Sequence, residues 1–268
     1  MTAGVSIQLN VRNFEKIWAE PPAEYAVIRF DLNDDCNLHC VYCHVPRSTE
    51  VIGLEAFHSF LHEKVLSVRH FQVGCGMEPT LDPRLCDFME AIGSCPAPPR
   101  EGIRLQTNGL LLHRHDAARM RAAGLAALTV SIDSASSVTH RSLRGGASLA
   151  KIQRNVVGFR RACPQVAVWL ITTVTAENID EVDDLLSWGL DEGVHGFELR
   201  QMFYYPTSPI VDHQRMRRLQ VTDEQFAAMR ERIETRFGGK ARLLIQGNDQ
   251  LMRRARKIRV DSQLPHRG

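Results

Sequence analysis

Short strand-like runs alternate with segments of helical apolar spacing along almost the whole chain, and this alternation is typical of βαβ units with a parallel sheet. The strand candidates are the seven runs 25–32, 70–75, 103–108, 127–133, 166–174, 196–202 and 241–246. The helix candidates between them are 54–67, 83–93, 113–123, 147–162, 178–192 and 222–236. Each helical segment is long enough to connect two parallel strands. The pattern predicts an α/β fold, and we expect a partial (β/α)6-type TIM barrel, with an open doubly wound sheet as the alternative.

The length and composition suit a single domain with a substantial core. The chain has 268 residues, of which 44% are apolar, and one α/β domain can reach this size. We expect a single domain over residues 1–268, with its core at about 25–246, a short N-terminal extension and a basic C-terminal tail. The tail contains MRRARKIRV at 252–260, for which a solvated helix face or a frayed end is favoured over a binding patch.

No stretch of the sequence predicts a secretory signal or a membrane span. The first twenty residues lack a basic start followed by an apolar run, and no later stretch approaches the ~18 apolar residues that a span needs. We therefore expect a cytoplasmic protein without a membrane partner. The net charge of +2, from 33 basic and 31 acidic residues, gives no global field that favours nucleic acid.

Three of the seven cysteines stand within eight residues, directly after the first predicted strand. Cys36, Cys40 and Cys43 have the spacing Cys-x3-Cys-x2-Cys. A disulfide framework is not favoured, because the number of cysteines is odd and cytosolic thiols are kept reduced. Three thiolates on one loop can hold an iron–sulfur cluster. A 4Fe-4S cluster with three protein ligands leaves one iron open to a small molecule.

Zinc and calcium are the alternative ligands for this loop. A structural zinc site needs four ligands, so His39 or a remote residue would have to complete it. Calcium is a second rival, because residues 31–35 begin like an EF-hand loop. That pattern then fails, since Cys36 stands where a glycine should turn the chain and Tyr42 where a bidentate glutamate belongs. Simple packing of three small apolar side chains is disfavoured by the polar residues around them.

Further unusual residues follow the next predicted strands. The stretch GCGMEP at 74–79 ends the second strand, TNG at 107–109 the third and SIDS at 131–134 the fourth. Because the C-terminal ends of parallel strands meet at one edge of the sheet, we expect these stretches to lie beside the cysteine loop. Both architectures under consideration place their chemistry at this edge.

The cysteine spacing, the aromatic Tyr42 before the last cysteine and the position after a first strand resemble the radical S-adenosylmethionine (radical SAM) enzymes. The resemblance covers roughly residues 25–246. It implies that Cys36, Cys40 and Cys43 hold one 4Fe-4S cluster whose open iron binds S-adenosylmethionine. It further implies that the reduced cluster cleaves this cofactor to methionine and a 5'-deoxyadenosyl radical, which abstracts hydrogen from a substrate.

The resemblance also implies cofactor contacts. Tyr42 would lie near the adenine. Gly76, Met77 and Glu78 resemble the Gly-Gly-Glu-Pro motif of the family, which receives the methionine amino group through backbone carbonyls and the glutamate. Met77 replaces the second glycine, so its backbone must follow a path allowed to L-residues. The alternative for this stretch is a Pro-terminated turn with a solvated glutamate.

Five more residues are candidates for the site. The family commonly places polar contacts to the cofactor at the positions of Asn108, Ser131 and Asp133, although a structural role suits them equally; Asn-Gly, for example, is a common turn pair. Arg200 would need a partner if buried, and a carboxylate of cofactor or substrate is suitable. Cys75 precedes the Gly76 motif and could donate a hydrogen atom, although ordinary packing is the favoured interpretation.

The sequence therefore predicts a radical SAM enzyme that acts on a small-molecule biosynthetic intermediate such as a sugar, a nucleotide or an amino-acid derivative. An external one-electron reductant such as a flavodoxin or a ferredoxin is implied. Beyond the loop only four cysteines remain, and their wide spacing predicts no auxiliary cluster. This absence slightly favours redox-neutral outcomes, including epimerisation or rearrangement.

Two alternatives stay open. The aromatic segment at 201–216 could form a rim for a peptide substrate, although a covering loop packed on the core is favoured. The second alternative is an iron–sulfur binding or electron-transfer protein without radical chemistry. Such a protein would have no need for Glu78, Asn108 and Asp133 at successive strand ends.

Overall fold

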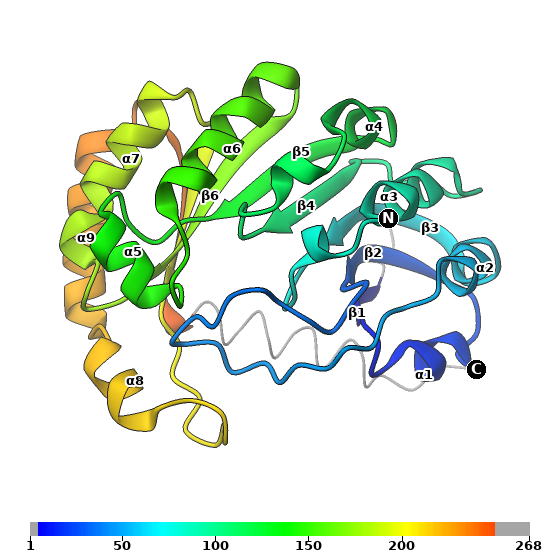
Figure 1. Cartoon of the computed structure of the whole chain (residues 1–268), viewed down its shortest axis with the longest axis horizontal. Helices are drawn as coiled ribbons and strands as arrows, with labels where there is room; N and C mark the ends of the chain where they lie inside the picture. Colours follow the sequence, from blue (N-terminus) through cyan, green and yellow to red (C-terminus); the bar gives the residue numbers. More distant parts are fainter. Residues whose placement is uncertain (1–4, 250–268) are drawn as a thin grey trace.

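The computed structural model describes residues 5–249, which form an eight-stranded sheet with helices on its outer face (Figure 1). The strands are β1 (Val5–Leu9), β2 (Ala23–Phe30), β3 (Val65–Val73), β4 (Ile103–Thr107), β5 (Leu125–Ser131), β6 (Ala167–Val174), β7 (Gly196–Gln201) and β8 (Arg242–Gln246). They pair in chain order, and every pair is parallel. The sheet curls into a half-barrel, which confirms the predicted α/β partial barrel.

Helices connect the strands and cover the convex side of the sheet (Figure 1). The α-helices are α1 (Phe14–Trp18), α2 (Leu54–Lys64), α3 (Leu85–Ser94), α4 (Ala117–Ala122), α5 (Ser137–Leu143), α6 (Leu149–Ala162), α7 (Val182–Asp191), α8 (His213–Leu219) and α9 (Asp223–Phe237). Three short 3-10 helices are η1 (Pro79–Leu81), η2 (Leu112–Arg114) and η3 (Ile179–Glu181). The long loop after β2, which carries the cysteine cluster, crosses in front of the barrel opening in this view.

All seven predicted strands and six predicted helices are present, with ends shifted by a few residues. The structure adds β1 as an eighth strand, and it adds α1, α5 and α8, each of five to seven residues. Such short helices contain too few turns for a repeated apolar pattern. The predicted helix at 113–123 is divided at Asp116, whose carboxylate accepts the amides of Ala118 and Arg119 and so begins α4 at Ala117.

The side of the sheet that faces the helices forms the core. Phe30 of β2 stacks on Phe57 of α2, with ring centroids 4.1 Å apart, and Phe57 also contacts Phe88 of α3. Phe60 and Phe71 complete this fully buried aromatic group. Burial of these rings fixes β2 and β3 against α2 and α3, and thereby fixes the loops that leave these strands.

The inner side of the half-barrel is polar. Gln106 of β4, Thr173 of β6 and Arg200 of β7 face inward, and Thr173 is the register partner of Arg200. Side chains alternate between the two faces of a strand, so the adjacent apolar residues Leu105, Val174 and Leu199 point outward into the core. The lumen is therefore suited to a polar ligand rather than to a packed core.

Within residues 5–249, no helix is long and apolar enough to cross a lipid bilayer. The described strands belong to one sheet, and the main apolar cluster extends across it. The expectation of one domain over residues 1–268 stays a prediction. The basic stretch 252–260 lies outside the described residues.

Candidate functional site

A cavity of about 230 Å³ opens at the C-terminal ends of the strands. It brings together nearly all the residues proposed from the sequence. Its lining includes Cys36, Cys40, Tyr42, Cys43, Cys75, Gly76, Met77, Glu78, Asn108, Ser131 and Arg200. Asp133 is fully buried and does not line the cavity.

The three cysteines of the loop after β2 are free, partly buried thiols. The backbone of Cys43 donates to the carbonyl of Cys40 at 3.0 Å, so the second half of the motif forms a tight turn. Burial raises the pKa of Cys36 to about 11 and also raises the pKa of Cys40. A thiolate in this environment needs positive charge beside it, and bound iron would supply that charge.

The donor set fits an iron–sulfur cluster. Thiolates are the soft ligands that such clusters prefer. In the part of the chain that the structure describes, no group of three or more His, Cys, Asp or Glu side chains is compact enough to hold a metal ion. Ligands of a multi-iron cluster are spread around its body instead of converging on one point. Three thiols that line one cavity are therefore compatible with a 4Fe-4S cluster.

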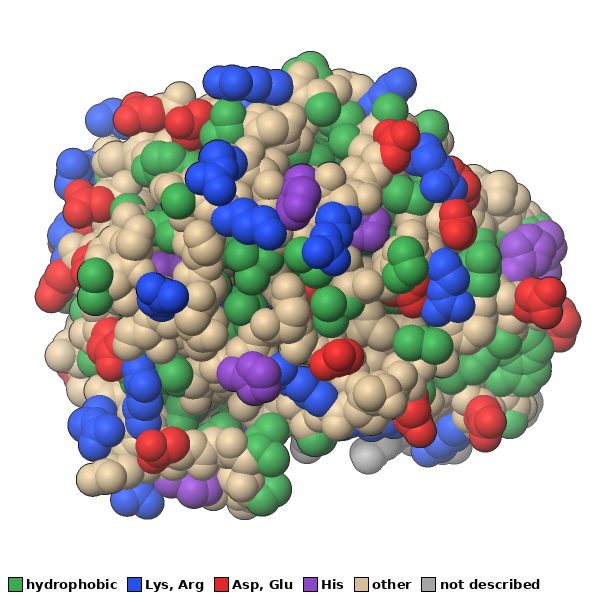
Figure 2. All heavy atoms as spheres, in the orientation of Figure 1, with side chains coloured by type: hydrophobic (Ala, Val, Ile, Leu, Met, Phe, Trp, Pro, Cys, Tyr) green, Lys and Arg blue, Asp and Glu red, His purple; other side chains and the backbone are tan. Residues whose placement is uncertain are grey.

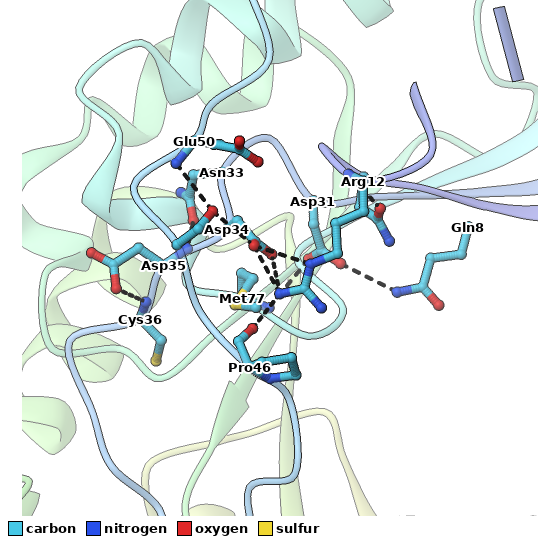
Figure 3. A network of polar contacts seen from close by, with 12 residues as sticks. Gln8, Arg12, Asp31, Asn33, Asp34, Asp35, Cys36, Pro46, Glu50 and Met77 are labelled. Atoms are coloured by element: carbon cyan, nitrogen blue, oxygen red, sulfur yellow. Dashed lines mark hydrogen bonds and ion pairs between the residues drawn. The ribbon is translucent and has the colours of Figure 1, made fainter. Parts of the chain in front are cut away.

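Arg12 joins the two ends of the cysteine loop through its guanidinium (Figure 3). It comes from the connection between β1 and α1, and its Nη2 lies 2.8 Å from Oδ2 of Asp34. Its Nε donates to the same carboxylate at 3.1 Å, and its Nη2 also donates to the carbonyl of Pro46. Asp34 precedes Cys36 and Pro46 follows Cys43. One arginine thus holds both ends of the loop.

Two further contacts hold the middle of the loop. Arg47 donates from its guanidinium to the carbonyls of Cys36, at 2.7 Å, and Leu38. Gly145, between α5 and α6, lies directly against His39: a Cβ at this glycine would be 2.4 Å from the His39 carbonyl oxygen. Gly145 also has φ +58°, which few L-residues adopt. The loop is therefore held from both sides by parts of the chain distant in sequence.

Asp31, at the end of β2, shapes the turn that follows β3. Its Oδ1 accepts the backbone amides of Cys75, Gly76 and Met77 at 2.7, 3.1 and 3.3 Å. Gln8 of β1 donates to its second oxygen at 3.4 Å. Burial raises the pKa of Asp31, and the amide hydrogen bonds oppose this shift. Among residues 5–249 no residue other than glycine has a positive φ, so Met77 follows an allowed path as predicted.

Glu78 is tied to the end of β4. Its Oε1 accepts hydrogen bonds from the hydroxyl of Thr107 at 2.6 Å and from Thr80, and its Oε2 accepts the amide of Asn108 at 2.7 Å. Burial raises the pKa of Glu78, although these hydrogen bonds favour the ionised form. Only 2% of the residue is exposed, so the alternative of a solvated glutamate is wrong. The carboxylate fixes the Met77 turn to the neighbouring strand.

Asn108 connects the cysteine loop with the end of β4. Its Nδ2 donates to Oδ1 of Asn37 at 2.8 Å and lies 4.0 Å from Sγ of Cys36. Its Oδ1 accepts the amide of Leu110 at 3.0 Å, which forms the turn expected for an Asn-Gly pair. Asn108 therefore has a structural role and also contacts a cysteine of the motif.

Asp133 forms a buried group beneath the cavity with Tyr42 and Arg144. The guanidinium of Arg144 binds both carboxylate oxygens, at 2.7 and 2.8 Å, and the Tyr42 hydroxyl donates to the same carboxylate. The amide of Thr173 adds a donor at 3.0 Å. Arg144 also lies over the Tyr42 ring, 5.6 Å from its centroid. Asp133 thus fixes two cavity-lining side chains rather than facing the cavity itself.

Ser131, Arg200 and Cys75 complete the lining from other strands. The guanidinium of Arg200 lies 2.7 Å from the carboxylate of Glu198, so its partner is a residue of its own strand. About one third of the Arg200 side chain is exposed. Burial and the nearby Asp31 raise the pKa of Cys75 well above its usual value, which favours the neutral thiol over the thiolate.

The aromatic segment after β7 divides its side chains between packing and solvent. Tyr204 packs on the small apolar cluster that contains Met202 and Met216. Tyr205 is 37% exposed and stacks on the ring of His44, with centroids 3.6 Å apart. His44 lines the cavity, so one aromatic side chain of this segment lies at its rim.

Sequence reasoning did not identify the structural contacts of Arg12, Asp31, Arg47, Arg144 and Gly145. Each of these contacts joins residues that are 9 or more positions apart. For Arg47 alone the sequence offers a local indication of a role at the loop, because this residue closely follows the last cysteine. The other partners are brought together only by the fold of the chain.

The family model described as "Radical SAM superfamily" matches residues 32–189, more than half of the chain. A GTP 3',8-cyclase of Synechococcus sp. (strain WH7803) is 35% identical over 152 residues, which cover 48% of this chain and 42% of that protein. An AdoMet-dependent heme synthase of Methanosarcina barkeri is 30% identical over 192 residues, covering 68% and 51%. The chain spans about half the length of the curated relatives it matches.

Solved structures share the fold. The crystal structure of Streptococcus suis SuiB bound to S-adenosylmethionine superimposes with a TM-score of 0.63 at 13% identity, over 88% of this chain and 54% of that one. A structure of anSMEcpe with bound AdoMet gives a TM-score of 0.61 at 16% identity, over 83% and 63%. At these identities the likeness concerns the partial barrel alone.

Proposed function

Since the chain belongs to the radical SAM superfamily, we propose that it cleaves S-adenosylmethionine reductively and abstracts a hydrogen atom from a small-molecule substrate. Cys36, Cys40 and Cys43 are the proposed ligands of one 4Fe-4S cluster. When bound, this cluster supplies the electron that cleaves the cofactor to methionine and the 5'-deoxyadenosyl radical. The proposal is carried by one observation: the three thiols and the turn at 76–78 line the same cavity.

The residues around the cysteines would hold the cofactor. We assign the methionine amino group to the backbone carbonyls of the turn at 76–78, which Asp31 and Glu78 hold in shape. Tyr42 would form the wall beside the adenine, and Asn108 and Ser131 would make polar contacts.

Arg200 and Cys75 are the groups that we assign to the substrate or to the cofactor carboxylate. A carboxylate or phosphate could replace Glu198 as the partner of Arg200, because the guanidinium is partly open to the cavity. The neutral thiol of Cys75 is suited to returning a hydrogen atom to a product radical. An external reductant would then restore the thiol with one electron and a proton. This assignment supports a redox-neutral outcome such as epimerisation or rearrangement.

A small-molecule substrate is favoured over a peptide. The relatives at 30–35% identity are named for GTP and for heme synthesis, and the cavity of about 230 Å³ is modest in size. Modification of a peptide is the second candidate. This second candidate function is supported by Tyr205, a partly exposed aromatic side chain that stacks on His44 at the rim of the cavity.

The test is the formation of 5'-deoxyadenosine. The protein is reconstituted anaerobically with iron and sulfide, reduced with dithionite and given S-adenosylmethionine, and the products are measured by liquid chromatography. We expect 5'-deoxyadenosine and methionine in equal amounts. If neither product formed from protein with a full complement of cluster iron, the chain would be an iron–sulfur protein without radical chemistry.

A matched pair of variants tests the ligand assignment. Cys40→Ala removes a proposed ligand and should abolish both cluster iron and 5'-deoxyadenosine. Cys163→Ala removes a buried thiol that does not line the cavity and should retain both. Cluster iron and activity that persisted in Cys40→Ala would show that the assignment is wrong.

A further inference from the structure

A group of basic side chains covers the outer surface of η2 and the first half of α6. It consists of His113, Arg114, Lys151 and Arg154, and we call it the η2–α6 patch. Lys151 and Arg154 are three residues apart on one helix and therefore share a face. Slight burial, then Lys151 and Arg114, lower the pKa of His113. Figure 2 shows Lys, Arg and His side chains gathered near the centre of this view, in the region beside α6.

The charges of the η2–α6 patch are not neutralised by the protein itself. Within residues 5–249, neither Arg114, Lys151 nor Arg154 forms an ion pair or a side-chain hydrogen bond. By contrast, Arg119 on the neighbouring helix α4 is neutralised by two ion pairs, with Asp87 and with Glu90, each at 2.7 Å. The patch therefore keeps its positive charge available for a partner.

Two short segments connect the η2–α6 patch to the cysteine loop. The first runs from Asn108, whose Nδ2 lies 4.0 Å from the sulfur of Cys36, to the start of η2 four residues later. Asn155 of α6 fixes this segment by donating to the carbonyl of Gly109 at 2.7 Å. The second runs from Gly145, which lies against the loop, to the start of α6 at residue 149.

From this placement we infer that the η2–α6 patch is the docking surface for an acidic one-electron donor protein of the flavodoxin or ferredoxin class. This inference rests on the proposed function, in which the cluster must receive one electron for each cleavage. The donor loses one electron, the cluster gains it, and no bond is made or broken in the transfer. Opposite charge would steer the donor to the side of the barrel on which Asn108 contacts Cys36.

A protein donor suits the patch better than a nucleic acid. Nucleic acids are bound along an extended basic stripe that follows the phosphate backbone. Here the basic group consists of two residues of η2 and two residues about one turn apart on α6, and the exposed residue Asp116 lies two positions after Arg114. The chain as a whole carries a net charge of only +2.

A double charge reversal tests the docking surface. Arg114→Glu combined with Lys151→Glu should raise the KM for a purified, reduced bacterial flavodoxin in the 5'-deoxyadenosine assay by about tenfold or more. Its affinity for the same flavodoxin, measured by fluorescence anisotropy without turnover, should fall by a similar factor. The wild-type affinity should fall with added salt, and the variant should lose most of this dependence. The rate with dithionite should not change.

The matched control is Arg161→Glu combined with Arg217→Glu. Arg161 lies in the last turn of α6, about 15 Å along the helix from Lys151, and Arg217 lies on α8. Both side chains are exposed, so the same charge is reversed away from the patch. This control should behave like the wild type with both reductants.

Several results would overturn the docking proposal. An unchanged KM and affinity in the double variant would do so, as would an equal loss in the control. An equal fall with dithionite and flavodoxin would place the effect at the cluster. Loss of binding to a single-stranded RNA oligonucleotide, with flavodoxin binding retained, would assign the patch to nucleic acid. Absence of 5'-deoxyadenosine with dithionite would contradict the proposed function, and anisotropy would still report on the patch.

Discussion

The carboxylate of Asp133 is fully buried, and the groups that bind its two oxygens are hydrogen-bond donors. Arg144, Tyr42 and the amide of Thr173 bind it directly. A buried charge without such partners would cost several kcal/mol, so the four groups are stable only together. Because Tyr42 and Arg144 also line the cavity, the position of these two side chains is fixed by a residue that does not line the cavity itself.

His140 on α5 adds a titratable group to this region. It is fully buried, and its Nδ1 accepts the amide of Asp133 at 3.3 Å. Burial lowers the pKa of His140 to about 4, from 6.5 in the unfolded chain. Since the folded pKa is the lower one, the neutral ring stabilises the fold above pH 6.5. This contribution is lost as the pH falls from 6.5 towards 4.

We predict that His140→Gln makes the free energy of unfolding less sensitive to pH. Between pH 7.5 and 5.5 the wild type should lose about 1 kcal/mol more than this variant, because only the wild type must protonate His140 on unfolding. Urea denaturation at the two pH values measures the difference. His70, whose pKa is also lowered to about 4, contributes equally to both proteins.

The control for this prediction is His140→Asn, a second replacement that cannot be protonated, which should show the same reduced pH dependence as His140→Gln. If His140→Gln and the wild type lost equal stability between the two pH values, the buried ring would not be the titrating group.

At the scale of elements, the strands were predictable because each is a run of apolar residues between loops. Strand β1 is the exception, because its sequence VSIQL does alternate apolar and polar residues and so carries a short local strand signal, although only Leu9 is fully buried. Helix α8 carries no such signal: of its seven residues only Met216 and Leu219 are buried, which is too few to show a helical period.

The connection between α5 and α6 gives a prediction at this scale. Gly145 and Gly146 both have positive φ, but they differ in their surroundings. A Cβ at Gly145 would overlap the His39 carbonyl, whereas a Cβ at Gly146 has nothing within 4 Å. Gly145→Ala should therefore displace the cysteine loop, lower the iron content after reconstitution and destabilise the protein by about 2–4 kcal/mol.

Gly146→Ala serves as the matched control. It should cost about 1 kcal/mol of backbone strain and leave the iron content unchanged. Iron analysis and thermal unfolding distinguish the two variants. Equal iron content in both would mean that the loop does not depend on its contact with Gly145.

At the scale of the whole molecule, the half-barrel has two edges. The described strands are ordered from β1 to β8 without a pair that joins these two. Strand β1 covers the edge of β2, and its segment also contributes Gln8 and Arg12 to the site. The first strand thus has two roles: it caps the sheet and it supports the loops above it.

Removal of residues 1–13 should expose the edge of β2. We predict that the truncated protein elutes from size-exclusion chromatography as larger species, because an uncovered strand edge pairs with other chains. It should also bind less iron. The full-length variant with Gln8→Ala and Arg12→Ala separates the two roles: it should bind less iron at an unchanged elution volume. A truncated protein with the elution and iron content of the wild type would contradict both roles.

The candidate site was predictable where its residues are neighbours in sequence. The three cysteines, Tyr42 and the stretch Gly76–Glu78 are local patterns, and the fold brings them to one cavity. The supporting residues were not predictable, because the fold brings them together with partners that are distant in sequence. Arg12 and Asp34 are 22 positions apart, and the fold alone makes them adjacent. Sequence therefore indicated the proposed ligands but not the residues that position them.

The contact between Asp31 and the turn after β3 has a consequence for how such chains are identified. Three amides of the turn bind this one carboxylate, and neither Gly76 nor Met77 has a positive φ. A Cβ at Gly76 would meet only ordinary contacts. An acid one strand away thus helps to specify the turn, and the turn conformation does not itself demand glycine at positions 76 and 77. A search pattern that demands two adjacent glycines would pass over this chain, whereas one that pairs the three cysteines with an acid directly after the preceding strand would retain it.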